Sequence, residues 1–142
     1  MRAVFAVQNG AAVAAAMATF GDAVQAKLNQ GMRNLGAQAQ ETAAAACPVA
    51  PRATVVRGHV HKPGFLRENI RVIPHEADIG FDLGWVASDF VEADEPFYAP
   101  HVTLGTRHQR AQDCLTPAFT QARDRLEALV AEAVSGAVRR AA

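Results

Sequence analysis

The side chains of this chain that could carry chemistry are its five histidines and two cysteines. His59 and His61 stand two residues apart, which places both imidazoles on one face of a strand, as many metal sites require. His101 and His108 could add ligands, with Cys114 as a soft ligand. No motif defines the third ligand. A small metal-dependent enzyme is therefore one hypothesis, and ordinary surface or hydrogen-bonded loop histidines are the other.

Other catalytic arrangements lack the residues that they need. Cys47 or Cys114 could act as a nucleophile beside a histidine base, but no glycine elbow or oxyanion-forming sequence flanks either one. The acidic residues between 89 and 95 match no calcium-binding loop. Gly105-Thr106 lacks the other glycines and the lysine of a phosphate loop. The sequence therefore favours a binding or structural protein over an enzyme, with no metal and no cofactor.

Length and charge constrain the class of protein. The 142 residues predict one domain, 1–142, with a core that needs no metal or disulfide. The net charge is zero, but residues 1–71 carry eight basic and three acidic side chains, residues 72–106 carry seven acids and no base, and residues 107–142 carry six basic and four acidic side chains. Such segregation is typical of complementary contact faces; ordinary solvated faces are the alternative.

A nucleic-acid role would depend on the basic residues between 52 and 71. The zero net charge excludes a basic nucleic-acid coat. These residues lack interleaved aromatic side chains for base stacking, so such a module would contact only the nucleic-acid backbone. The basic residues are Arg52, Arg57, Lys62, Arg67 and Arg71.

The N-terminus resembles a signal peptide only in part. Arg2 precedes an apolar stretch, and Ala14, Ala16 and Ala18 supply small residues near a cleavage site. The apolar periodicity continues past that point, however, so cleavage would divide an amphipathic helix. No window is long and apolar enough for a membrane span. Two cysteines without CxxC spacing require no oxidising compartment, so we expect a cytoplasmic site of synthesis with both thiols free and buried.

Hydrophobic periodicity predicts the elements of the first half. Residues 3–8 read as a short strand closed by Asn9-Gly10. An apolar stripe at spacings of three and four predicts a long helix over 11–46 that ends before Pro48 and Pro51. The stripe contains Val13, Met17, Phe20, Val24, Leu28, Met32 and Leu35. Residues 48–68 are rich in proline and glycine and predict a loop or arm that holds a hairpin around 54–61.

The second half predicts antiparallel strands followed by a helix. Strands are expected over 69–73, 79–83 and 85–91, with a hairpin turn at 76–78 and an acidic loop over 92–96. A C-terminal amphipathic helix is expected to begin with Thr116 as N-cap and Pro117 at its first helical position. Its apolar face contains Phe119, Ala122, Leu126, Leu129, Val130, Ala133 and Val134. The predicted fold class is α+β, with both long helices packed on a small antiparallel sheet.

Three motifs, in this order, carry a family resemblance. The first is Ala50-Pro51 after the long helix, followed by Gly64-Phe65-Leu66-Arg67. The second is the run from Tyr98-Ala99-Pro100 to Gly105-Thr106, and the third is Leu115-Thr116-Pro117-Ala118-Phe119. Together they resemble the minor tail component, or tail-completion, family of long-tailed phages. The chain departs from that pattern by nine extra residues between Thr54 and Gly64, by Thr103 in place of a frequent glutamate, and by Asp113-Cys114-Leu115 in place of a proline step.

The resemblance implies a structural virion protein of the neck between phage head and tail. It implies a homo-oligomeric ring, usually six-fold, that is assembled in the host cytoplasm and contacts neck, head-closure, tail-terminator or tail-tube proteins. DNA would pass through the ring without sequence-specific binding, and no membrane and no catalytic residues are expected. A head-closure stopper or a tail terminator of the same connector is the alternative. The interface candidates are Pro51, Gly64, Leu66, Arg67, Tyr98, Ala99, Pro100, Gly105, Thr106 and Pro117.

The segment 48–64 is a candidate arm that orders on assembly. Arg52, Arg57 and Lys62 on this arm could meet an acidic neighbour or DNA. We favour the protein partner, because a channel through which DNA slides should not bind it tightly.

Overall fold

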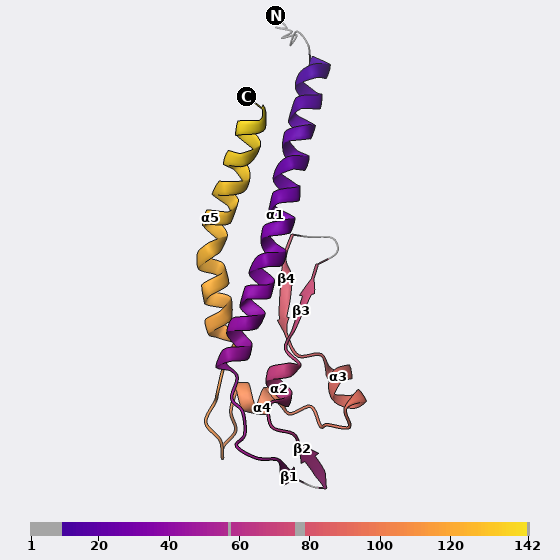
Figure 1. Ribbon diagram of the computed structural model, residues 1–142, viewed down its shortest axis with the longest axis vertical. Coiled ribbons are helices and arrows are strands. Elements are labelled where there is room, and N and C mark those ends of the chain that lie inside the picture. The colour runs from indigo at the N-terminus through magenta and orange to yellow at the C-terminus, as the bar shows by residue number, and fades with distance from the viewer. Residues whose placement is uncertain (1–9, 57, 76–78, 142) are drawn as a thin grey trace, which may run out of the picture.

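The computed structural model describes residues 10–56, 58–75 and 79–141 (Figure 1). The strand expected over 3–8 and the turn expected at 76–78 lie outside these residues. In chain order the elements are α1 (Gly10–Ala46), β1 (Thr54–Val56), β2 (His59–His61), α2 (Phe65–Glu68), β3 (Arg71–Pro74), β4 (Phe81–Gly84), α3 (Ala87–Glu92), α4 (Ala99–Thr103) and α5 (Leu115–Ala141). The predicted α+β class is confirmed.

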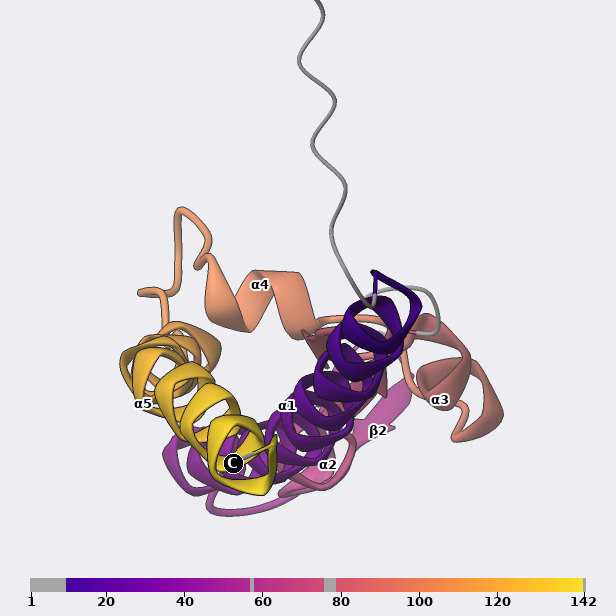
Figure 2. The same cartoon turned by 90° about the horizontal axis from the view of Figure 1, so that it is seen from above.

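The two long helices form an antiparallel pair. Helices α1 and α5 lie side by side in both views, and the N-terminal turns of α1 extend beyond the end of α5 (Figures 1 and 2). Both helices were predicted, and α1 continues through Gly21, Gly31 and Gly36 without a break. Close approach explains one of them, because Leu129 of α5 lies directly over Gly31. Farther along, Thr42 donates a hydrogen bond to Gln121 (3.0 Å).

The four strands form two separate hairpins rather than one sheet. Strands β1 and β2 pair antiparallel with Val55 opposite Val60, as predicted for 54–61. Strands β3 and β4 pair with Val72 opposite Leu83, close to the predicted strands 69–73 and 79–83. The second hairpin packs against α1 at Gly36, where an added Cβ would lie 2.9 Å from Val72 Cγ1.

The strand expected over 85–91 is wrong. Residues Ala87–Glu92 form helix α3, which begins after Val86 in an extended conformation. A single turn of helix buries only Phe90, and Asp89 beside it accepts a bond from Arg71 Nε (2.9 Å). A short apolar run cannot distinguish a strand from one helical turn by periodicity. The same limit explains why α2 was missed inside the expected loop or arm 48–68 and why no element was predicted over α4.

The N-cap of α5 also differs from the prediction. Asp113, not Thr116, caps the helix: its Oδ1 accepts hydrogen bonds from the backbone N–H groups of Leu115 (2.9 Å) and Thr116 (3.1 Å). A carboxylate that accepts from residues two and three positions ahead is the usual N-cap arrangement. Pro117 is the third residue of α5 rather than the first helical residue that was predicted, and it lies within the first turn.

The buried core lies at the base of the helical pair, where the short elements meet the last turns of α1 and the first turns of α5. Phe90 is its largest fully buried side chain, with edge-to-face aromatic contacts to Phe65 (5.0 Å), Phe97 (4.9 Å) and Tyr98 (5.8 Å). The core cluster contains Ala39, Ala43, Cys47, Phe65, Leu66, Ile70, Leu83, Phe90, Ala99, Cys114 and Ala118. This cluster fixes the loops that surround it.

Candidate assembly surface at the base of the helical pair

A cleft of about 540 Å³ opens at the base of the molecule. We call it the basal cleft. The segment after α1, the β1–β2 hairpin, α2, α4 and the loop before α5 supply its walls. It is lined by Pro48, Val49, Ala50, Pro51, Thr54, His61, Lys62, Gly64, Phe65, Leu66, Tyr98, His101, Val102, Gln109 and Gln112. The lining is mostly apolar, and its charged or titratable side chains are Lys62, His61, His101 and Tyr98.

The buried carboxylate of Glu95 holds the β1–β2 hairpin to the body of the protein. Its side chain is 1% exposed. One oxygen accepts the backbone N–H of Lys62 (3.2 Å). The other oxygen, Oε2, lies 3.1 Å from His61 Nδ1, but the two atoms are not aligned for a hydrogen bond. Neither Oε2 nor Nδ1 has a hydrogen-bond partner among the described residues. A buried charge requires such compensation, so this contact positions one wall of the basal cleft.

A C-terminal cap on α3 directs Glu95 inward. Asp94 adopts a left-handed backbone with φ of 54°. The N–H of Glu95 donates to Phe90 O (2.8 Å) and the N–H of Asp94 donates to Val91 O (3.2 Å). These two bonds form a Schellman motif. The motif turns the chain back toward the core and leaves the Asp94 side chain exposed.

Tyr98 links this cap to the basal cleft. Its ring meets the His61 imidazole edge to face at 4.8 Å, and it packs on Phe90. Burial, together with the charges of Glu95 and Cys47, raises the pKa of Tyr98 to about 12. The phenol is therefore neutral at physiological pH, so it offers an O–H donor at the cleft wall.

Four of the ten interface candidates taken from the sequence meet in the basal cleft: Pro51, Gly64, Leu66 and Tyr98. Ala99 is buried behind them. Gly64 has a φ of 82°, a conformation that glycine adopts without strain.

The remaining candidates lie around the cleft or away from it. Arg67 reaches across the base, where its guanidinium donates to the carbonyl oxygen of Cys47 (3.0 Å). Pro100 is exposed on α4, and Pro117 is exposed on α5. Gly105, with φ of 76°, precedes a tight turn in which the N–H of Thr106 donates to Gln109 O (2.8 Å).

The histidines do not gather into one cluster. His61 and His101 share the basal cleft, but His59 is exposed on β2 and His108 accepts a hydrogen bond from Arg107 Nε (2.7 Å). Over the described residues, no group of three histidine, cysteine or acidic side chains could hold a metal ion.

The two cysteines meet where α1 ends and α5 begins. Cys47 and Cys114 are both free and buried, as expected. Burial and the hydrogen bond with Cys114 raise the pKa of Cys47 to about 12, and burial raises the pKa of Cys114. Because the thiolate is the nucleophile, this environment favours the unreactive form.

Some charged residues of this part of the molecule pair with another group, and others form no ion pair among the described residues. Asp89 is held by Arg71, and Arg67 is bonded to the end of α1. Among the residues that the structure describes, Glu92 and Asp94 form no ion pair. They project beside Val91, which is 79% exposed. We call the exposed residues Val91, Glu92, Asp94 and Phe97 the α3 knob.

Large apolar side chains remain exposed over much of the surface. Leu104 in the loop after α4 is 80% exposed. Helix α5 carries a stripe on a face that α1 does not cover, so the predicted apolar face of this helix is only partly buried. The exposed stripe contains Phe119, Leu126, Val130, Val134 and Val138. Apolar patches of this kind usually mark contact surfaces.

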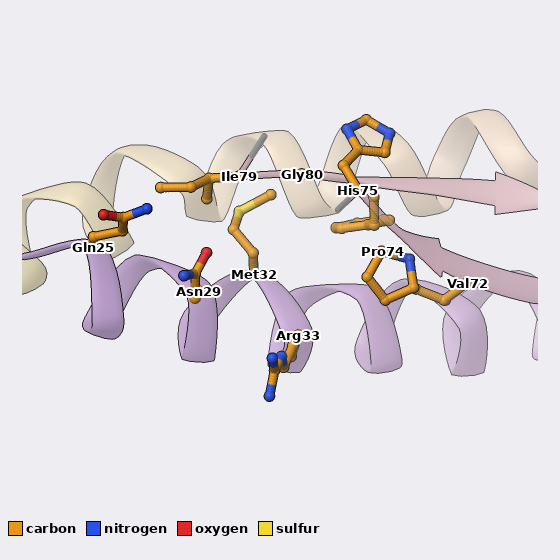
Figure 3. A pocket seen from close by; sticks show the side chains of 10 residues that line it. Gln25, Asn29, Met32, Arg33, Val72, Pro74, His75, Ile79 and Gly80 are labelled. Atoms are coloured by element: carbon orange, nitrogen blue, oxygen red, sulfur yellow. The ribbon is translucent and has the colours of Figure 1, made fainter. Parts of the chain in front are cut away.

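A second cleft, of about 550 Å³, lies between α1 and the β3–β4 hairpin. Met32 and Ile79 point toward one another across it (Figure 3). Arg33 and His75 point away on opposite sides (Figure 3). Polar groups that converge on a ligand are the usual mark of a small-molecule site; here Arg33 and His75 diverge, and only Gln25 and Asn29 rise from α1 toward the cleft (Figure 3).

Comparison of the chain with family models, with curated proteins and with solved structures gives no match. Within the described residues, no helix combines the length and hydropathy needed to cross a membrane.

Sequence reasoning missed two parts of this surface. It treated 92–96 as one solvated acidic loop, whereas Glu95 is buried and Asp94 caps a helix. It also expected Val91 to belong to a strand. The α3 knob depends on the tertiary contacts of Phe90, and a local sequence pattern does not reveal such contacts.

Proposed function

We propose that this protein is a structural subunit of the head–tail neck of a long-tailed phage, which completes the tail and joins it to the DNA-filled head as a ring around the DNA channel. The observation that carries the proposal is the basal cleft. It brings together motif residues that are distant in sequence, namely Pro51, Gly64, Leu66 and Tyr98. Residues that belong to one motif set and share one surface are expected to serve one contact.

The exposed apolar surface supports an assembly role. A protein that works alone rarely leaves extended apolar patches in water, yet α5 carries a full stripe of them. A closed ring requires two different surfaces on each subunit, because its contacts are heterologous. The basal cleft and the α3 knob supply two surfaces of different character.

The first test is the assembly state of the purified chain. Analytical ultracentrifugation and native mass spectrometry are expected to show closed oligomers whose population grows with protein concentration. Electron microscopy should show these oligomers as rings with an open centre. A strictly monomeric protein at the highest accessible concentration, or open-ended filaments, would contradict the proposal.

The second test removes the gene from the phage or prophage that carries it. The expected particles are filled heads and tails of normal length that fail to join. A tail terminator would instead leave tails of irregular length, and a stopper would leave heads that lose their DNA. Normal infectious particles would falsify a role in the neck altogether.

A further inference from the structure

The α3 knob and the basal cleft are complementary in charge and in apolar character. The knob presents two carboxylates, on Glu92 and Asp94, beside the apolar side chain of Val91. The cleft presents the Lys62 ammonium and the His101 imidazole beside apolar residues such as Val49. Complementary charges around an apolar centre are typical of specific protein contacts.

The two surfaces do not engage each other within one chain, because among the described residues Lys62 forms no ion pair with Glu92 or Asp94. Helix α3 and the loop before α5, which closes one wall of the cleft, lie on opposite sides of the base in both views (Figures 1 and 2). Because the knob and the cleft are different surfaces, they permit repeated head-to-tail contact between copies. The same arrangement leaves one unfilled cleft and one unused knob on any single subunit.

The backbone of the knob gives an independent reason to assign it a role. Asp94 occupies the left-handed region with φ of 54°, where glycine would be less strained by about 1 kcal/mol. Its carboxylate forms no ion pair among the described residues. Stability of the monomer therefore does not explain an aspartate here. Side chains that break a local rule without a local gain are expected at functional positions.

We propose that the α3 knob of one copy docks into the basal cleft of the next copy, with Glu92 and Asp94 facing Lys62 and His101. This inference rests on the proposed ring and names its subunit contact. Val91 enters between the apolar walls, near Val49. The Glu95 contact with His61 and Lys62 then couples the two surfaces, because it joins the base of the knob to one wall of the cleft.

Cross-linking between two variants that each carry one added cysteine tests the contact. V91C and V49C are mixed, with an affinity tag on one of them, and treated with a mild thiol oxidant. The native Cys47 and Cys114 are buried, so they contribute the same background of cross-linking in each arm of the experiment. The expected product is the mixed disulfide dimer, formed about tenfold more than the V91C–V91C product or the product of V91C with V134C. Equal yields in all three arms would overturn the contact.

Charge-reversal variants provide the second part of the test. K62E should lower the yield of the mixed dimer about tenfold, because it places like charges together. Combining K62E in the cleft partner with E92K in the knob partner should restore part of the yield. Lack of rescue would overturn the assigned pairing. The backbone N–H that Lys62 donates to Glu95 remains in K62E, so the cleft wall keeps that bond.

The variant Asp94→Gly distinguishes an effect on docking from an effect on folding. It is expected to raise the stability of the monomer while lowering the yield of the mixed dimer severalfold. If Asp94 had only a structural role, the stability of the monomer and the yield of the mixed dimer would change in the same direction. If rings form but respond to none of these variants, the knob contact is wrong while the ring survives. If no oligomer and no selective cross-link form, the proposed function falls as well.

Discussion

Gly31 of α1 faces the side chain of Leu129 of α5 at a close approach of the two long helices. A Cβ atom added to Gly31 would lie 2.9 Å or less from Cγ, Cδ1 and Cδ2 of Leu129. An added Cβ would therefore force the Leu129 side chain out of its present position between the two helices. The absence of a side chain at residue 31 therefore sets the spacing of the helical pair at this level.

Gly31→Ala is expected to destabilise the protein by about 1–2 kcal/mol. Overpacking against Leu129 costs about 1–3 kcal/mol, which exceeds the roughly 1 kcal/mol that alanine gains over glycine in a helix. Urea unfolding followed by circular dichroism measures the difference.

The matched control for this change is Gly21→Ala in the same helix, because an added Cβ there meets nothing within 4 Å. It should stabilise the protein by up to about 1 kcal/mol. In addition, Leu129→Ala should remove most of the penalty of Gly31→Ala, which a double-mutant cycle will show as positive coupling. Equal effects of the two glycine substitutions would contradict the close contact.

Glu95→Ala is expected to destabilise the protein by about 2–4 kcal/mol. The change leaves the Lys62 N–H without its buried acceptor and the His61 imidazole without the carboxylate 3.1 Å away, and such losses are costly. Glu95→Gln keeps an oxygen acceptor and should cost less. Hydrogen exchange should show faster opening of the β1–β2 hairpin than of α1 in both variants.

The control for Glu95 is Asp82→Ala, which removes the partner of His75 at 3.2 Å. The Asp82 side chain is 75% exposed, so its loss should change stability by no more than about 0.5 kcal/mol. If both substitutions have the same small effect, Glu95 does not hold the hairpin.

Asp94→Gly should stabilise the monomer by about 0.5–1 kcal/mol, because glycine adopts the left-handed conformation without the Cβ penalty. The reverse substitution is available at Gly105, whose φ is 76°. An added Cβ there would lie 2.7 Å from the backbone nitrogen of Ala111. Gly105→Ala should therefore destabilise by about 2 kcal/mol or more. Thermal unfolding of both variants checks the opposite signs.

The elements that were predicted correctly have a clear signal in the sequence. The helix that ends near Cys47 and the C-terminal helix show apolar periodicity over several turns, and the 54–61 hairpin is marked by glycine and proline. Helix α3 carried neither, since Phe90 alone decides its burial. Capping by Asp113 in place of Thr116 was missed because both residue types are good caps, and only the path of the preceding loop chooses between them.

The resemblance grouped ten interface candidates, but it did not indicate which of them share a surface. Four of them, Pro51, Gly64, Leu66 and Tyr98, lie in the basal cleft. The sequence could not indicate that Glu95 turns inward while Glu92 and Asp94 face solvent. That division depends on a left-handed residue after a short helix, and an aspartate in an acidic run gives no sign of it.

The thiols of Cys47 and Cys114 are expected to react slowly with a small alkylating reagent in the native protein. Burial raises the pKa of both groups, so little thiolate forms at mildly alkaline pH. In urea both thiols should react at the rate of an ordinary cysteine, at least about a hundredfold faster. Mass spectrometry counts the modified groups. Rapid native labelling at either position would contradict the packed junction between α1 and α5.

Asp113→Ala should lower stability at neutral pH by about 1 kcal/mol, because the N-terminal amides of α5 lose their acceptor. Hydrogen bonds with Thr116, from its side chain and its backbone, hold the pKa of Asp113 below the usual value of 3.8. A carboxyl whose pKa is lower in the folded state stabilises the fold above its unfolded pKa and loses that contribution as pH falls through its folded pKa. The difference between wild type and Asp113→Ala should therefore shrink in acid. Asp113→Asn, which keeps a neutral acceptor, should retain most of the cap and show no such dependence. Urea unfolding of all three proteins at neutral and acidic pH measures this, and a pH-independent difference for Asp113→Ala would show that the charge of Asp113 does not contribute to the cap.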